Sequence, residues 1–322
     1  MDNRITKRRL SDFLSYEWIL IIITVVAAIV LLELFSTFLK VKTTPGQRFN
    51  YYYDENVYSD NDGVFIGTVN KGDTFSYDIR EVSGEALSGD YNVLSVRLST
   101  GDGDVIFTDN YEKQSGDGTT ARVKTIIDSY DMFTFGGGND ESGILYNAKK
   151  YLSGFLKEGE INPTVYDNLD ENKIIANFNE RTKKERIYRN DLNAGLISSE
   201  NEKERIKKLC EEVAFFEKVV EYDKTLNADD SIFYSYKKSE QTVNNGGEAP
   251  LGYEESYAKN YGINLSRLGE KARNTFRVKG DYSADVIVLA FDFRKQATDL
   301  QYETLSFINS IIRNYADFIN LL

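Results

Sequence analysis

An uninterrupted apolar run near the amino terminus constrains the fold of this chain more than any other feature. Trp18–Leu39 reads WILIIITVVAAIVLLELFSTFL, 22 residues in which Glu33 is the only charge. About 20 apolar residues in a helix are enough to cross the hydrocarbon core of a bilayer. A helix buried in a protein core would rarely be apolar on every side over such a length. The run therefore predicts a single transmembrane helix over residues 18–39.

The segments that flank this helix predict its orientation. Four Lys and Arg residues lie between positions 4 and 9, and three more follow the helix by position 48, so the excess on the amino-terminal side is small. Positive charge favours the cytoplasmic side of a membrane. The apolar run is longer than a signal-peptide core, and no small-residue cleavage site follows it. We therefore expect an uncleaved signal anchor in the cell membrane, with residues 1–17 as a cytoplasmic tail and residues 40–322 as an extracytoplasmic domain.

The composition excludes several kinds of chemistry. The 322 residues include no histidine, so a Ser-His-Asp triad, a Cys-His pair or a histidine metal site cannot form within the chain. Cys210 is the only cysteine, which excludes an internal disulfide and a multi-cysteine metal site. The net charge is −12, whereas a protein that binds nucleic acid needs clustered Lys and Arg to neutralise phosphates. We expect no nucleic-acid partner.

Short motifs of known enzymes and metal sites occur only in incomplete form. Ser-x-x-Lys appears at Ser235–Lys238 and Ser256–Lys259, without the further elements of a penicillin-recognising enzyme. Asp60–Gly63 resembles part of a calcium-binding loop, but the first and last ligand positions lack carboxylates. The glycines at positions 136–138 are not followed by the Lys-Ser/Thr of a P-loop. We therefore expect a non-catalytic protein with no metal and no cofactor.

Apolar residues at helical spacing predict amphipathic helices beyond the anchor. Ser199-x-x-Glu202 is a capping box, and it predicts the start of a helix with Cys210 on its buried face. A buried thiol with no histidine to activate it is expected to be inert. The other stretches with helical spacing are residues 139–157, part of residues 170–190 and residues 299–322.

Two further stretches predict strands. Residues 75–79 (FSYDI) alternate apolar and polar side chains, as in a strand with one buried face. Asp285–Phe293 (DVIVLAFDF) has a continuous apolar centre, as in a strand covered on both faces. Asn244–Gly247, followed by Pro250, predicts a loop between the segments. Strands followed by amphipathic helices predict an α/β domain.

A resemblance to a known family rests mainly on Val93–Asn110 (VLSVRLSTGDGDVIFTDN). This segment is similar to extracytoplasmic solute-binding proteins of bacterial ABC sugar importers, in which a helix ends in a small-residue turn and an Asp-Val start opens a buried strand. The whole chain, with FLSYEW at Phe13–Trp18 and LQYETLSFINSIIRNY at Leu300–Tyr315, resembles membrane-anchored proteins of clostridia-like Firmicutes whose ectodomain is a diverged binding-protein lobe.

The resemblance implies one transmembrane helix followed by an α/β ectodomain of solute-binding type. Either both lobes of this ectodomain are complete or one of them is incomplete. It implies a non-catalytic protein that is accessory to an ABC-type importer, with the membrane, a transporter permease and a carbohydrate as partners. Asp109 and Asn110 follow the strand at Asp104–Thr108, where cleft residues of such proteins tend to lie, and they are the implied ligand contacts. The alternative is that these two residues form only a solvated turn.

Two points remain open at the level of sequence. Leu94, Val96 and Leu98 alternate, so this stretch fits a β-hairpin as well as the helix that the resemblance favours, and we expect the helix. Sugar sites commonly stack an aromatic ring on the pyranose, yet the only tryptophan lies in the apolar run. The tyrosines that could take its place are Tyr130, Tyr234, Tyr236 and Tyr253.

The rival hypothesis is an envelope interaction or assembly protein, pilin-like or structural, that binds no small molecule. Phe13 and Glu17 ahead of the apolar run resemble the start of a type IV pilin, although Asp12 occupies the position where such leaders carry glycine. On this hypothesis Glu33 and the acidic surface would contact protein partners.

Overall fold

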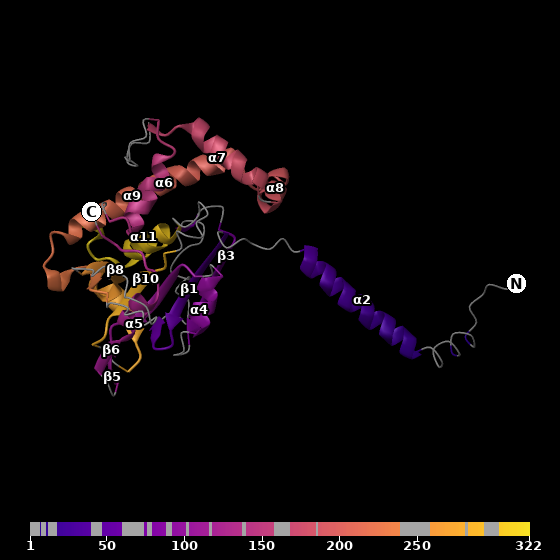
Figure 1. Ribbon diagram of the computed structural model, residues 1–322, viewed down its shortest axis with the longest axis horizontal. Coiled ribbons are helices and arrows are strands. Elements are labelled where there is room, and N and C mark those ends of the chain that lie inside the picture. The colour runs from indigo at the N-terminus through magenta and orange to yellow at the C-terminus, as the bar shows by residue number, and fades with distance from the viewer. Residues whose placement is uncertain are drawn as a thin grey trace, which may run out of the picture. The chain divides into compact units, whose positions relative to one another are not determined.

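The computed structural model separates the chain into two compact units, Met1–Lys42 and Thr43–Leu322 (Figure 1). The residues that the structure describes are 7, 11, 18–39, 47–59, 74–75, 79–87, 92–100, 103–115, 118–136, 140–157, 168–184, 186–238, 258–280, 283–292 and 303–322.

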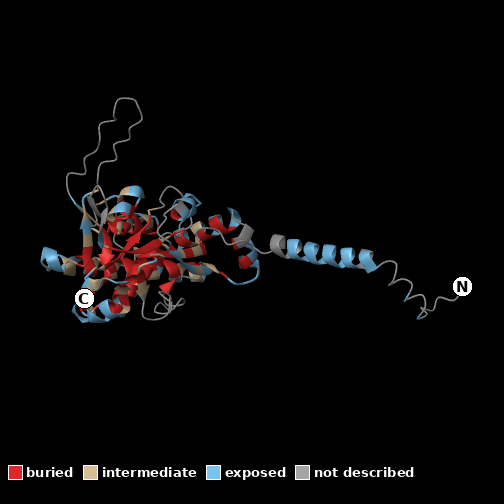
Figure 2. Cartoon of the chain, turned by 90° about the horizontal axis from the view of Figure 1, so that it is seen from below, coloured by how far each residue is buried: buried red, intermediate tan, exposed pale blue. Residues whose placement is uncertain are grey.

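The first unit contains the helix α2, Trp18–Leu39, with the bounds expected from the apolar run. Its described side chains are exposed, whereas the buried residues of the second unit concentrate in strands and flanking helices (Figure 2). Across the described part of the chain, no helix is long and apolar enough to cross a membrane.

The second unit is built around a six-stranded mixed sheet with the strand order β3-β1-β4-β10-β8-β7. The first three of these strands are parallel to one another. β10 is antiparallel to both of its neighbours, and β7 is antiparallel to β8. The bounds are β1 Arg48–Asp54, β3 Glu81–Leu87, β4 Val105–Asp109, β7 Phe233–Tyr236, β8 Lys259–Asn264 and β10 Val286–Ala290.

Helices cover both faces of this sheet, which confirms the α/β prediction (Figure 1). Alternate residues of the central strands belong to two separate cores: Ile106 and Ile287 face one, and Phe107 and Val288 face the other. The first core holds α4 Asn92–Ser99 and α5 Arg122–Ser129, and the second holds α6 Ile144–Ser153, α9 Ser199–Asp223 and α11 Glu303–Tyr315.

The remaining elements lie around these layers. α7 and α8 follow α6, and α9 packs against α6, α7 and α11. Two short antiparallel ribbons, β2–β9 and β5–β6, complete the unit. Their bounds are β2 Val57–Ser59, β5 Glu112–Ser115, β6 Gly118–Ala121, β9 Phe276–Val278, α7 Glu171–Lys184, α8 Arg186–Asn193 and α10 Glu270–Thr275.

Most of the elements predicted from apolar spacing are present. All five residues of β10 are buried, as expected for a strand covered on both faces, and the carboxy-terminal helix is α11. α6 and α7 fall within the predicted ranges 139–157 and 170–190. Two of the motifs, Asn244–Gly247 with its following proline and Asp60–Gly63, lie outside the described residues.

The helix expected at residues 94–98 is confirmed, and the hairpin alternative is wrong. α4 spans Asn92–Ser99, and β4 follows it. Leu94 is fully buried and Leu98 packs against the same core, whereas Val96 is 65% exposed. A strand would have placed all three side chains on one face, so the period of the burial is that of a helix.

The interior of the strand expected at residues 75–79 lies outside the described residues, which include only its two ends. Phe75 lies in a bend, and Ile79 has no regular secondary structure. Both side chains are nevertheless buried, and the Phe75 ring lies 4.7 Å from that of Phe49. The strand of this region is β3, Glu81–Leu87, whose sequence EVSGEAL has mostly exposed residues because it forms an edge of the sheet. Apolar alternation marks buried strands and therefore missed it.

The capping residue of α9 is Ser198 and not Ser199. The Ser198 hydroxyl accepts a hydrogen bond of 3.3 Å from the backbone N–H of Asn201. The residue three positions after Ser198 is Asn201, whose side-chain oxygen accepts a hydrogen bond of 2.8 Å from the Ser198 hydroxyl, whereas the buried Glu202 carboxylate binds two arginines. The helix that the motif predicted is present, and Cys210 lies buried on it. Burial, together with the nearby Glu211, raises the pKa of the Cys210 thiol to about 12, so the expected inert thiol is supported.

A buried ion network fixes the helices on the α9 side of the sheet to one another. The Glu202 carboxylate accepts hydrogen bonds of 2.9 Å from Arg181 of α7 and of 2.8 and 3.0 Å from Arg205 of α9. Arg205 also donates to the hydroxyl of Tyr151 of α6 over 2.6 Å. All three charges are nearly excluded from water, so removing the Glu202 carboxylate takes away the counter-charge that the two guanidinium groups share.

We predict that Glu202→Gln lowers the free energy of unfolding by about 3 kcal/mol, because two buried guanidinium groups then lose their shared counter-charge. The matched control is Glu200→Gln on the same helix, where the side chain is 73% exposed and pairs with Lys203. This variant should change the free energy by no more than about 0.5 kcal/mol. Denaturant titration of both variants measures the difference, and equal effects would contradict the assignment.

Candidate functional site

The candidate ligand site of this sheet lies at the carboxyl ends of the parallel strands β1 and β4. β1 lies between β3 and β4, so the chain leaves β1 toward one neighbour and later returns to the other side of it. Crevices at such switch points, outside the carboxyl ends of parallel strands, are the usual ligand sites of these sheets. Asp109 is the last residue of β4 and Asn110 follows it, so the structure places both predicted contacts at this end.

A buried hydrogen bond joins the two strands just before the site. The Thr108 hydroxyl of β4 donates to the carboxylate of Asp54, the last residue of β1, over 2.5 Å. Both residues are at most 1% exposed. A carboxylate at this depth requires donors, because an unsatisfied buried charge is costly. The bond therefore fixes the ends of the two strands relative to each other.

Asp109 is buried, contrary to the alternative of a solvated turn. It is 1% exposed, and its carboxylate accepts a hydrogen bond of 3.0 Å from the backbone N–H of Tyr111. The guanidinium of Arg122, the first residue of α5, lies 3.8 Å from the other carboxylate oxygen. Asn56, with its amide oxygen turned toward Arg122, accepts from that guanidinium over 2.5 and 2.7 Å. The site thus combines residues from after β1, from the end of β4 and from the start of α5.

Asn110 connects β4 to the start of β10. Its side-chain oxygen accepts from the backbone N–H of Asp285 over 2.7 Å, and its own N–H donates to the carbonyl of Asp285 over 3.2 Å. Asn264, the last residue of β8, donates to the Asp285 carboxylate over 2.8 Å. Polar side chains at the ends of four sheet strands therefore form one row, from β1 to β8.

The row supplies carboxylates, amides and one guanidinium, the groups that bind the hydroxyls of a sugar-like ligand. Asp109 and Asn110 were predicted because they follow a recognisable strand. Asn56 and Arg122 could not be predicted, because neither residue follows a strand that the apolar pattern identified. Among the described residues, no three His, Cys, Asp or Glu side chains are grouped to hold a metal ion.

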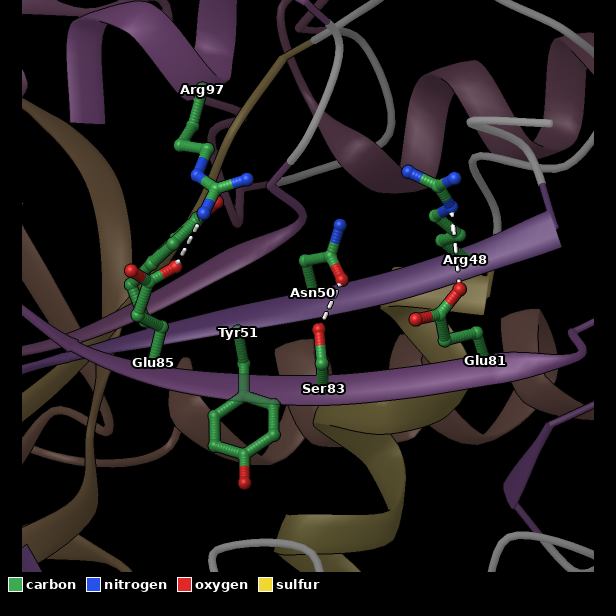
Figure 3. A pocket seen from close by; sticks show the side chains of 8 residues that line it. Arg48, Asn50, Tyr51, Glu81, Ser83, Glu85 and Arg97 are labelled. Carbon is green, nitrogen blue, oxygen red and sulfur yellow. Dashed lines mark hydrogen bonds and ion pairs between the residues drawn. The ribbon is translucent and has the colours of Figure 1, made fainter. Parts of the chain in front are cut away.

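A second polar site lies on the α4 face of the sheet, beside the edge strand β3 (Figure 3). Its cavity has a volume of about 140 Å³ and is partly open to solvent. Its interactions are an Arg48–Glu81 pair at 3.4 Å, a Ser83–Asn50 hydrogen bond of 2.6 Å and an Arg97–Glu85 pair at 3.3 Å. We call this site the β3 groove.

The opposite face of the same strands is closed by Tyr51, whose ring points away from the β3 groove (Figure 3). A Cβ atom on Gly84 would lie 2.1 Å from Cζ of this ring, so only glycine fits beneath it. Burial, and secondarily the neighbouring Tyr53, raises the pKa of Tyr51 to about 12, so the ring stays neutral at physiological pH.

Three of the tyrosines suggested as sugar-stacking groups, Tyr130, Tyr234 and Tyr236, pack against the core that holds α4 and α5. Tyr130 makes a hydrogen bond of 2.9 Å with Ser95, and Tyr236 donates to Asp128 over 2.9 Å. Tyr130 follows the carboxyl end of α5, whereas Arg122 lies at its amino end, so Tyr130 does not join Asp109. Burial, with Tyr236 and Glu112 nearby, raises the pKa of Tyr234 to about 12. Tyr253 lies outside the described residues.

Comparisons with known proteins identify no relative of this chain. No family model matches it, and neither a curated protein nor a solved structure is detectably similar to it.

We predict that Thr108→Val lowers the free energy of unfolding by about 1–3 kcal/mol, because it removes the hydroxyl that donates to the buried Asp54 carboxylate. The control is Thr125→Val on α5, an exposed position where the change should be within about 0.5 kcal/mol. Chemical denaturation of the two variants distinguishes them. If Thr125→Val lowers the free energy of unfolding as much as Thr108→Val, the hydrogen bond between Thr108 and Asp54 does not stabilise the fold more than an exposed hydroxyl does.

Proposed function

We propose that this protein is a non-catalytic, membrane-tethered protein with a solute-binding-like lobe, accessory to an ABC-type importer of carbohydrate. The observation that carries the proposal is the polar row at the carboxyl ends of the sheet strands, where Asp109 and Asn110 lie at a topological switch point. Its carboxylate, amide and guanidinium groups suit a ligand that is rich in hydroxyls.

The number of lobes bears on how a ligand would be held. The described residues of the second unit contain one large sheet, accompanied only by two-stranded ribbons. A single lobe cannot enclose a solute between two opposing walls. The polar row would then be completed by a partner, and a permease at the same membrane fits this requirement, which favours an accessory role over free solute capture.

The membrane anchor belongs to the same proposal. It rests on the sequence of α2, 22 residues with Glu33 as the only charge. A tether of this kind would hold the second unit near a permease at high effective concentration.

We predict that the amino terminus is cytoplasmic and the second unit extracytoplasmic. Protease added to intact spheroplasts should remove the residues beyond about Lys40 and leave an amino-terminal tag protected. The control is the same digestion after permeabilisation, which should remove both. Protection of the carboxy terminus in sealed cells would reverse the orientation and contradict the importer proposal.

Ligand binding is tested on the full chain in detergent with a panel of mono- and oligosaccharides. A sugar that binds only the folded state should stabilise it by about 2.7 kcal/mol at 100 times its dissociation constant. Asp109→Asn should lose most of this stabilisation, because it changes the charge at the polar row. Glu81→Gln, an exposed change on β3, should retain it. Absence of any stabilisation across the panel would contradict sugar binding.

The second candidate is an envelope interaction or assembly protein without a small-molecule ligand. It is favoured by a specific observation: the side chains of the polar row are hydrogen-bonded to one another and to the backbone of the row, as in a structural network. Purification from membranes separates the two proposals. Recovery of an importer permease supports the first, and recovery of secretion or assembly proteins without a permease supports the second.

A further inference from the structure

The sheet ends in an exposed edge strand with a pattern that is complementary to itself. We propose that β3 pairs with β3 of a second copy of this chain, antiparallel about Gly84, so that two six-stranded sheets join into one. This inference goes beyond the proposed function, because it does not depend on whether a sugar binds.

β3 is the outermost strand of the described sheet. In the described part of the chain no strand lies beyond β3, which pairs only with β1. Five of its seven residues are exposed, among them Gly84 and Ala86, whose small side chains leave the backbone accessible. An exposed edge presents a row of backbone N–H and C=O groups that can pair with another strand.

Two features that commonly protect an edge are missing from β3. It has seven residues in regular register with β1 from Arg48↔Glu81 to Asp54↔Leu87, without a bulge. It also contains neither proline nor lysine. The strand is therefore long and regular enough to accept a partner strand.

The charges of β3 select the antiparallel register. Pairing about Gly84 gives full overlap and places Glu81 opposite Leu87 and Ser83 opposite Glu85 of the other copy. No two glutamates are then directly opposed. A parallel in-register pairing would oppose Glu81 to Glu81 and Glu85 to Glu85, and like charges directly opposite each other destabilise a sheet.

The two faces of the strand also match under this pairing. Val82, Gly84 and Ala86 share the face that Tyr51 covers, and a two-fold axis through Gly84 places Val82 opposite Ala86 of the other copy. On the other face the two β3 grooves meet, and Arg97 beside Glu85 provides the positive charge that separates the two Glu85 carboxylates. A self-complementary patch of this kind is what a two-fold dimer requires.

These properties identify a second copy as the occupant. When two copies of β3 pair about Gly84, no glutamate faces another glutamate. An edge that binds an unrelated peptide would not need a sequence with this symmetry. Chains anchored in one membrane would also meet at high effective concentration.

The test is site-specific cross-linking of the full-length protein in membranes. Two differently tagged chains carry Ser83→Cys and Glu85→Cys, and a short bismaleimide is added. The two residues are directly opposed in the proposed register, with Cβ atoms about 5 Å apart. The buried Cys210 thiol leaves little background reaction. The control is a pair of Glu81→Cys chains, whose cysteines would lie about 20 Å apart along the strands.

We expect the Ser83→Cys and Glu85→Cys chains to shift to twice the mass of one chain, and the Glu81→Cys pair to remain unlinked. All three positions are exposed, so the variants should fold alike, which their thermal unfolding checks. Linking of Glu81→Cys chains would show a parallel pairing and overturn the register. A product joined to a different protein would identify a heterologous partner. That product, or no product at all, would overturn the proposal.

Discussion

Burial of the central strands on both faces is the constraint on which the rest of the structure depends. Every residue of β4 and of β10 is buried, so neither strand can be stable without a helical layer on each side. α4 and α5 cover one face of these strands, and α6, α9 and α11 cover the other. Polar side chains are costly to bury between two helical layers, so they are placed at the ends of these strands. The polar row lies there for this reason.

Solvent exposure increases from the centre of the sheet toward the β3 edge. β4 is completely buried, whereas β3 is mostly exposed and carries its charged residues toward the β3 groove. The central strands are therefore enclosed by the helical layers, whereas most of the described β3 residues are accessible to another molecule. The polar row shares a property with each region. Its side chains are buried and hydrogen-bonded like those of the central strands, but they lie at an end of the sheet.

Apolar spacing predicted the elements whose faces are buried and failed for those that are not. The strand at Val286–Ala290 was visible as a continuous apolar run, and the helices α6, α9 and α11 were visible because apolar residues recur along them at helical spacing. β3 shows neither signal, because five of its seven residues are exposed at the edge of the sheet. The cap of α9 is Ser198, one residue before the predicted Ser199, and its side chain bonds to Asn201 and not to Glu202.

The sequence alone determined the layered α/β class, the inert thiol of Cys210, the helix at the apolar run and the position of Asp109 and Asn110 after a buried strand. These follow from local patterns of burial. Only the tertiary structure decided that Asp109 is buried beside Arg122, that Asn110 holds the start of β10, and that β3 is an edge. Such facts depend on which distant segments meet, and the order of strands in a sheet is set by packing between segments that share no local signal.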